Sequence, residues 1–95
     1  VYNDSDVSDI QLISNTPNPW AEYTNINFYL PKSMDVEFAI YDLAGRKLIT
    51  KNGNYNEGLN TIIIEQSELN ADGVLYYEIK TSTRKIVKKM IALKK

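Results

Sequence analysis

The fold of this chain is decided by Val36-Glu37-Phe38-Ala39-Ile40-Tyr41-Asp42-Leu43-Ala44-Gly45-Arg46. Apolar Val36, Phe38 and Ile40 alternate with other side chains, the period of a strand that buries one face. Asp42 to Gly45 has the composition of a hairpin turn, in which glycine supplies the positive φ that such turns need. We therefore predict a strand over residues 36–43 and a returning strand over residues 46–51.

The same alternation recurs along the rest of the chain, and turn residues separate its copies. We predict further strands over residues 10–14, 25–30, 60–64, 73–81 and 85–93, with turns or loops at 15–19, 52–54 and 56–58 around Tyr55. Side chains expected to face inward are Ile26, Phe28, Leu30, Ile62, Ile64, Leu75, Tyr77 and Ile79. Leu69 should anchor a crossing loop over residues 66–72. Helical periodicity is missing, so the sequence predicts an all-β fold: a single immunoglobulin-like antiparallel β-sandwich of about seven strands.

The final strand is apolar and bordered by lysines. Its apolar residues Ile86, Val87, Ile91 and Leu93 should help to close the core, although the pattern leaves open which of them point inward. Such a border either marks an interaction segment or protects a sheet edge from aggregation. The basic residues concerned are Arg84, Lys85, Lys88, Lys89, Lys94 and Lys95.

Length and charge restrict the possible functions. Ninety-five residues make one domain, and the 11 basic and 12 acidic residues nearly balance, so a nucleic-acid partner is not expected. No apolar run approaches the roughly 20 residues that span a bilayer. Residues 1–9 carry Asp4, Asp6 and Asp9 and no basic residue. We therefore divide the chain into an acidic linker, 1–9, and a sandwich domain, 10–95.

Residue types needed for common catalysis are missing. The chain has no histidine and no cysteine. It therefore lacks the residues that most often form nucleophile–base pairs and bind zinc. Glu65, Glu68 and Asp72 are acids that glycoside chemistry could use, but clustered in one polar loop they indicate solubility. The stretch Asp4–Asp9 is similar to the start of a calcium loop, but Asp9 and Asn15 stand where that loop needs glycine and glutamate. We expect no enzyme, no cofactor and no metal.

Aromatic residues suggest one binding alternative. Trp20 and Tyr23 could form a platform on which a glycan stacks. A tryptophan directly after a proline turn is also typical of a side chain that caps the edge of the core. Glycan binding therefore stays an alternative function.

Several local motifs follow one another in a recognisable order. These are Asn18-Pro19-Trp20, the alternating Thr24 to Pro31, the stretch Val36 to Arg46 with its Ile40-Tyr41-Asp42-Leu43-x-Gly45-Arg46 box, Gly58, Leu69-x-x-x-Gly73-Val74-x-Tyr76-Tyr77 and Lys88-Lys89-Met90-Ile91. Over about residues 12–95 the chain resembles the type A C-terminal sorting domain of cargo proteins of the Bacteroidetes type IX secretion system. It departs from that family in having Trp20 where phenylalanine is usual and Leu75 where an aromatic residue is usual.

The resemblance implies an export signal and not a catalyst. Such a domain directs an attached upstream cargo protein from the periplasm across the outer membrane, to the cell surface or the extracellular space. The implied partners are the type IX secretion machinery and a sortase-like cysteine protease that removes the domain. Residues 1–9 would be the exposed linker in which that protease cuts.

The resemblance also divides the residues into two sets. We expect the machinery to recognise Arg84, Lys85, Lys88, Lys89, Met90, Ile91, Lys94 and Lys95, through strand addition and steering toward an acidic receptor. The other set is structural and comprises Asn18, Pro19, Trp20, Tyr41, Asp42, Leu43, Gly45, Arg46, Gly73 and Tyr77. In this set, Gly45 should form the turn and Arg46 should pair with Asp42.

One further alternative uses the same skeleton. The motifs also resemble the immunoglobulin-like domain of flagellar hook-capping proteins, which implies a retained structural or assembly module of an extracellular protein. The terminal stretch Lys88-Lys89-Met90-Ile91-Ala92-Leu93-Lys94-Lys95 and its position at the end of the chain favour the sorting domain.

Overall fold

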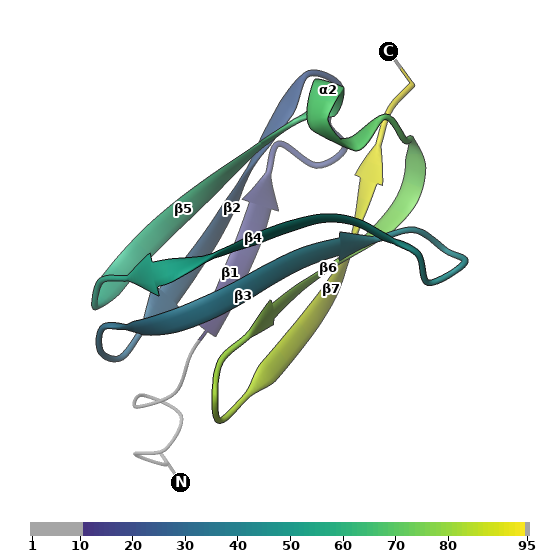
Figure 1. The fold of residues 1–95 in the computed structure, drawn as a ribbon. Helices are drawn as coiled ribbons and strands as arrows, with labels where there is room; N and C mark the ends of the chain where they lie inside the picture. Colours follow the sequence, from purple (N-terminus) through teal and green to yellow (C-terminus); the bar gives the residue numbers. More distant parts are fainter. Residues whose placement is uncertain (1–10, 95) are drawn as a thin grey trace, which may run out of the picture.

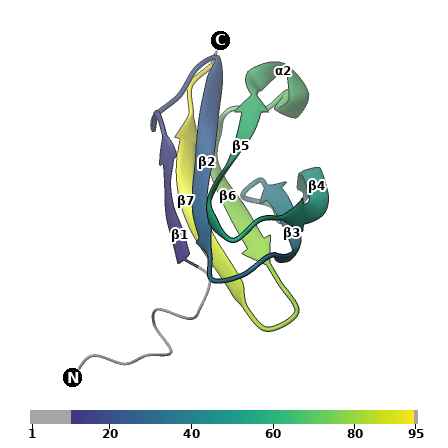
Figure 2. The ribbon, with the colours of Figure 1, turned by 90° about the vertical axis from the view of Figure 1, so that its left-hand side faces the viewer.

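The computed structural model describes residues 11–94 and contains two antiparallel sheets that pack face to face (Figures 1 and 2). Its elements are β1 (Gln11–Thr16), β2 (Tyr23–Leu30), β3 (Met34–Tyr41), β4 (Lys47–Tyr55), β5 (Gly58–Glu65), α2 (Gln66–Leu69), β6 (Gly73–Lys80) and β7 (Lys85–Ala92). One sheet has the order β1-β2-β5 and the other β4-β3-β6-β7. The predicted all-β sandwich is confirmed.

The core lies between the two sheets and consists of the residues that alternate along each strand. Its buried members include Ile26, Phe28, Leu30, Val36, Phe38, Ile40, Ile62, Ile64, Leu69, Leu75, Tyr77 and Ile79. The inward faces predicted for these strands are therefore confirmed, as is Leu69 as an anchor. Burying each large apolar side chain stabilises the fold by about 1.5–3 kcal/mol.

The inward face of β7 differs from the expectation. Met90 and Ala92 are buried, and Ile86 packs partly buried against the core. Val87 is 50% exposed and Ile91 is 40% exposed, so the expectation that these two close the core was wrong. The register explains this, because Met90 pairs with inward-facing Leu75 and Ile86 with Ile79. Leu93, beyond the strand, is also exposed.

Three segments predicted as loops are more regular than expected. β4 continues through residues 52–54 to Tyr55, which pairs with Met34. The Tyr55 ring makes a T-shaped contact with the Phe28 ring, with the centroids 5.4 Å apart. β1 extends to Thr16, into the predicted turn. Residues 66–69 form the short helix α2. In each case partners on other strands or a capping residue outweigh the local preference of the sequence.

The two ends of the sandwich carry different elements. β1 begins at the end that holds the β6–β7 hairpin, whereas α2 and the end of β7 lie at the opposite end (Figure 1). The linker 1–9 with its calcium-like pattern, Ile10 and Lys95 lie outside the described residues. Within the described residues, no helix has the length and apolar character needed to cross a membrane.

Candidate recognition site

The end of β7 is held by a segment more than 70 residues earlier in the chain. Trp20 donates its backbone N–H to the Ile91 carbonyl at 3.1 Å and accepts the Leu93 N–H at 2.7 Å. The Asn18 Oδ1 accepts the Ile91 N–H at 3.0 Å. We call Asn18, Pro19 and Trp20 the terminal clamp. It closes this part of the sheet edge through a parallel bridge between Trp20 and Ala92.

A second contact to the terminal segment comes from α2. The Gln66 amide Nε2 donates to the Leu93 carbonyl at 3.3 Å. The backbone N–H of Gln66 in turn donates to the Glu22 carbonyl at 2.9 Å, which ties α2 to the segment that precedes β2. The Leu93 backbone is therefore bonded at both its N–H, by Trp20, and its carbonyl, by Gln66.

The clamp rests on a buried polar network. The Thr24 hydroxyl donates to the Pro17 carbonyl at 2.8 Å, and the Asn15 amide lies 3.3 Å from the Thr24 hydroxyl. The Tyr77 hydroxyl donates to the Asn15 Oδ1 at 3.1 Å across the two sheets. Burial raises the pKa of Tyr77. Tyr77, a residue of the predicted structural set, is thus tied through Asn15 and Thr24 to the segment that leads into the terminal clamp.

Trp20 itself belongs to the core. Its side chain is 1% exposed, whereas Tyr23 lies at the surface. The two cannot form one exposed platform, so the alternative of a glycan platform built from Trp20 and Tyr23 was wrong. The alternative expectation, that Trp20 caps the edge of the core after the proline turn, is confirmed.

The Asp42–Arg46 hairpin is held by one carboxylate. Asp42 Oδ1 accepts the backbone N–H groups of Ala44 and Arg46, each at 2.9 Å, and Oδ2 accepts the Arg46 Nε at 2.7 Å. The Arg46 backbone N–H, followed by its guanidinium, holds the pKa of Asp42 below its ordinary value. Gly45 has φ +85°. The predicted turn role of Gly45 and the predicted Asp42–Arg46 ion pair are both confirmed.

The rest of the predicted structural set is spread around this hairpin. Tyr41 is half-buried beneath the Lys47 ammonium, 5.8 Å from the ring centroid. Leu43 is exposed at the hairpin tip. Gly73 adopts φ +90° where β6 begins. These residues shape the end of the sandwich at which β7 finishes.

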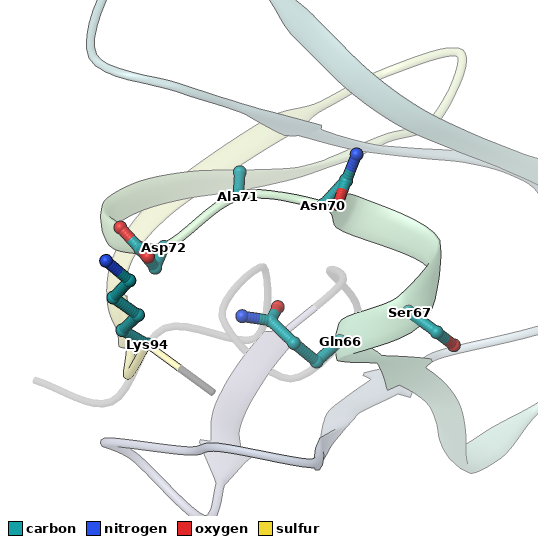
Figure 3. Close-up of a pocket in the computed structure, with 6 residues that line it drawn as sticks. All are labelled: Gln66, Ser67, Asn70, Ala71, Asp72 and Lys94. Carbon is teal, nitrogen blue, oxygen red and sulfur yellow. The ribbon is translucent and has the colours of Figure 1, made fainter.

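The acids of the loop after β5 have structural partners. Glu65 and Glu68 form a capping box on α2, and Glu68 also pairs with Lys51 at 2.9 Å. The Lys51 ammonium and the Glu65 backbone N–H lower the pKa of Glu68. Asp72 lines a polar surface pocket together with Gln66, Ser67, Asn70, Ala71 and Lys94. Figure 3 shows Asp72 and Lys94 beside each other, with Gln66 pointing toward them.

The residues predicted for recognition do not all reach the surface. Arg84, Lys85, Lys88, Lys89, Ile91 and Lys94 are exposed. Met90 is 1% exposed, so a partner cannot contact it while the domain is folded, and we remove it from the exposed set. Its physical role is to fill the core opposite Leu75. Lys95 lies outside the described residues.

Comparison with known proteins identifies the family. The chain matches the model of the secretion system C-terminal sorting domain over residues 16–93. The chain belongs to this family. The matched range runs from the end of β1 past the end of β7, and so includes the terminal clamp, the Asp42–Arg46 hairpin and the lysine-bordered strand. The predicted C-terminal sorting domain of the type IX system is confirmed, and export toward the outer membrane and cell surface follows from it.

A solved structure shows the same fold. The crystal structure of dimeric latent PorU from Porphyromonas gingivalis matches with a TM-score of 0.69 and 17% sequence identity. The match covers 90% of this chain and 9% of that chain. At this identity the likeness establishes the fold of the sorting domain and no more. A comparison with curated proteins found no match.

Proposed function

We propose that this domain is the removable export signal of a cargo protein attached upstream. The signal takes its cargo from the periplasm across the outer membrane through the type IX machinery, and a sortase-like protease then cuts within the acidic linker, 1–9. Membership of the sorting-domain family is the observation that carries the proposal. In this proposal the partners recognise and cut the domain, so the domain is their substrate. A sorting signal does not need to catalyse a reaction itself.

The fold supports a separation between the end that joins the cargo, where β1 begins, and the end that the machinery recognises, where β7 finishes. β1 begins at the end opposite α2 and the end of β7 (Figure 1). A protease working upstream of β1 and a receptor working on the last strand would therefore approach different ends of a rigid sandwich. The lysines of β7 would steer the domain toward an acidic receptor surface.

The terminal clamp supports the proposal because it lowers the conformational entropy that β7 would lose on binding a receptor. A free terminal strand would lose conformational entropy when a receptor ordered it, roughly 1–2 kcal/mol per residue. The clamp and Gln66 hold the backbone of Ile91 and Leu93 in place beforehand. A receptor that reads the folded strand would then meet its side chains in a fixed frame.

The proposal is tested by fusing residues 1–95 to a reporter directed to the periplasm of a bacterium with a working type IX system. We expect the reporter outside the cell and the domain missing from the exported product. A strain that lacks the secretion machinery is the control. A reporter that stays in the periplasm of the competent strain would refute the sorting function. An exported product that keeps the domain would favour the retained structural module instead.

A second experiment tests the recognition set. Lys85, Lys88 and Lys89 are replaced together by glutamine, which keeps the stems but removes the charges. Lys32, Lys47 and Lys80, which are exposed outside β7, are replaced in a control that removes the same number of charges. We expect export to fall only in the first variant while both variants unfold at similar denaturant concentration. Equal export of the two variants would remove β7 from the recognition set.

A further inference from the structure

Part of the outer edge of β7 is open. The β6–β7 hairpin is closed by the bond from the Thr81 N–H to the Arg84 carbonyl at 2.8 Å. In an antiparallel ladder, directly opposed residues alternate between hydrogen-bonded and non-bonded pairs. The even-numbered residues of β7 therefore bond to β6, and Lys85, Val87 and Lys89 direct both N–H and C=O away from the sheet. The terminal clamp agrees with this parity, because it binds the odd-numbered Ile91 and Leu93.

The clamp divides this edge into a closed part and an open part. Ile91 and Leu93 are occupied by Trp20, Asn18 and Gln66. Among the described residues, no strand pairs with β7 on the side of Lys85, Val87 and Lys89. The side chains of these three residues are exposed on the outer face of the sheet. We call this segment, Lys85–Lys89, the open edge.

The charges of the open edge select its occupant. Lys85 and Lys89 lie on either side of Val87 on one face, and β7 contains no acidic residue. If a second copy of β7 added in antiparallel orientation about Val87, Lys85 of one copy would oppose Lys89 of the other, and like charges directly opposite destabilise a pair. An extended segment with acids at those positions and an apolar residue between them would form three favourable cross-strand pairs.

The open edge of β5 lacks this character. The Gln66 N–H bonds to the Glu22 carbonyl, so the even-numbered residues of β5 bond to β2. The backbone groups of Leu59, Thr61 and Ile63 therefore point outward. Their side chains are apolar or neutral and offer no charge to an acidic partner. β5 therefore provides an internal control with the same backbone geometry and different side chains.

We propose that the open edge accepts an extended partner segment with the pattern acidic-x-apolar-x-acidic, which adds to the sheet β4-β3-β6-β7 as a further strand. Backbone hydrogen bonds to Lys85, Val87 and Lys89 give affinity, and the lysines give specificity. The inference rests on the proposed function, since it assigns this segment to a component of the secretion machinery. It restricts recognition by strand addition to the part of β7 that the terminal clamp leaves uncovered.

The first test uses purified protein and the peptide acetyl-Thr-Glu-Thr-Val-Thr-Glu-Thr-amide. Titration into residues 1–95, followed by amide chemical shifts, should move the signals of Lys85, Val87 and Lys89 most. A peptide with lysine in place of glutamate should leave them unmoved. The double variant Lys85→Glu/Lys89→Glu should reverse this preference. Shifts absent at millimolar peptide, or centred on β5, would overturn the proposal.

The second test blocks the backbone. Val87→Pro removes an outward N–H without removing a bond to β6, and proline is tolerated on an edge strand when its N–H side faces solvent. Ile63→Pro is the matched change on β5. We expect Val87→Pro to weaken peptide binding at least about tenfold, and Ile63→Pro to leave it within error. Equal binding by the two proline variants would contradict the proposal.

Export separates the two levels of inference. If the unmodified domain exports the reporter and Val87→Pro does not, while Ile63→Pro does, both proposals stand. If all three export it, the open edge is not the recognition site, although the sorting function stands. If the unmodified domain fails, the sorting function fails, and the peptide titration still decides whether the open edge binds an acidic strand. Should Val87→Pro not fold, the charge-reversed variant decides the same question.

Discussion

Removing one hydroxyl from Tyr77 should destabilise the sandwich measurably. The Tyr77 hydroxyl donates to the Asn15 Oδ1 at 3.1 Å, and both side chains are buried. Tyr77→Phe keeps the ring and its contact with Phe38, at 6.5 Å between centroids. It leaves the buried Asn15 acceptor without this donor, which costs about 1–3 kcal/mol. For a domain of this size each kcal/mol corresponds to a change in Tm of about 4–8 °C.

Tyr76→Phe is the matched control for this change. Tyr76 is the neighbouring residue on β6, and its side chain lies on the outer face with 36% exposure. The chemical change is the same, but no buried acceptor is left behind, so the free energy of unfolding should change by less than about 0.5 kcal/mol. Urea unfolding can be followed by the fluorescence of Trp20, the one tryptophan of the sequence, which is buried in the folded state.

The pH dependence gives an independent check. Burial raises the pKa of Tyr77 above its ordinary value of 10.0. The unfolded chain therefore loses this proton first, so the contribution of Tyr77 is fully present below pH 10 and is lost as the pH rises further. The stability difference between the unmodified domain and Tyr77→Phe should shrink in that range. Equal destabilisation by Tyr76→Phe and Tyr77→Phe, or a difference that does not change with pH, would refute this reasoning.

Three further predictions address the turn, the terminal strand and the acid range. Gly45→Ala should cost about 1–2 kcal/mol in urea unfolding through backbone strain, because φ is +85° and no atom lies within 4 Å of the added Cβ; an unchanged midpoint would contradict this. Met90→Ala should cost about 2–5 kcal/mol and Val87→Ala far less, since Met90 alone of the two is buried; a reversed order would contradict the register of β7. Lys51 lowers the pKa of Glu68 below its ordinary value of 4.5, so Lys51→Gln should reduce the loss of stability as the pH falls below that value; acid unfolding profiles that coincide would exclude this contribution.

The alternation of side chains made most of the sandwich predictable. On β2, β3 and β6, the inward residues follow from period two alone, because each of these strands has neighbours on both sides and one buried face. The Asp42–Arg46 hairpin was equally predictable, since its bonds are local and its residue types are those that tight turns require. Here local preference and tertiary structure agree.

Prediction failed where distant partners override local preference. Residues 52–54 have the composition of a loop, but pairing with β3 keeps them in β4. On β7 the apolar residues occupy both parities, so composition could not distinguish buried Met90 from exposed Ile91. The terminal clamp was not predicted, because Asn18 and Ile91 lie 73 positions apart and their hydrogen bond leaves no periodic trace in the sequence.

The register of β7 controls the core and the open edge together. In an antiparallel strand, the side-chain direction and the hydrogen-bond direction both reverse at each residue. Ile86, Met90 and Ala92 therefore face the core, and the even residues, including the exposed Lys88, bond to β6. Lys85, Val87 and Lys89 instead expose both their side chains and their backbone groups. A shift of one residue would turn Lys85 and Lys89 toward the core and expose Met90, and it would replace the outward backbone groups of Lys85, Val87 and Lys89 by those of even residues. The terminal clamp opposes that shift, because it bonds to the backbone of Ile91 and Leu93. The motif at residues 18–20 thus fixes the register of the open edge, Lys85–Lys89, without contacting it. Local sequence patterns do not reveal this connection, because the two segments lie far apart in the chain.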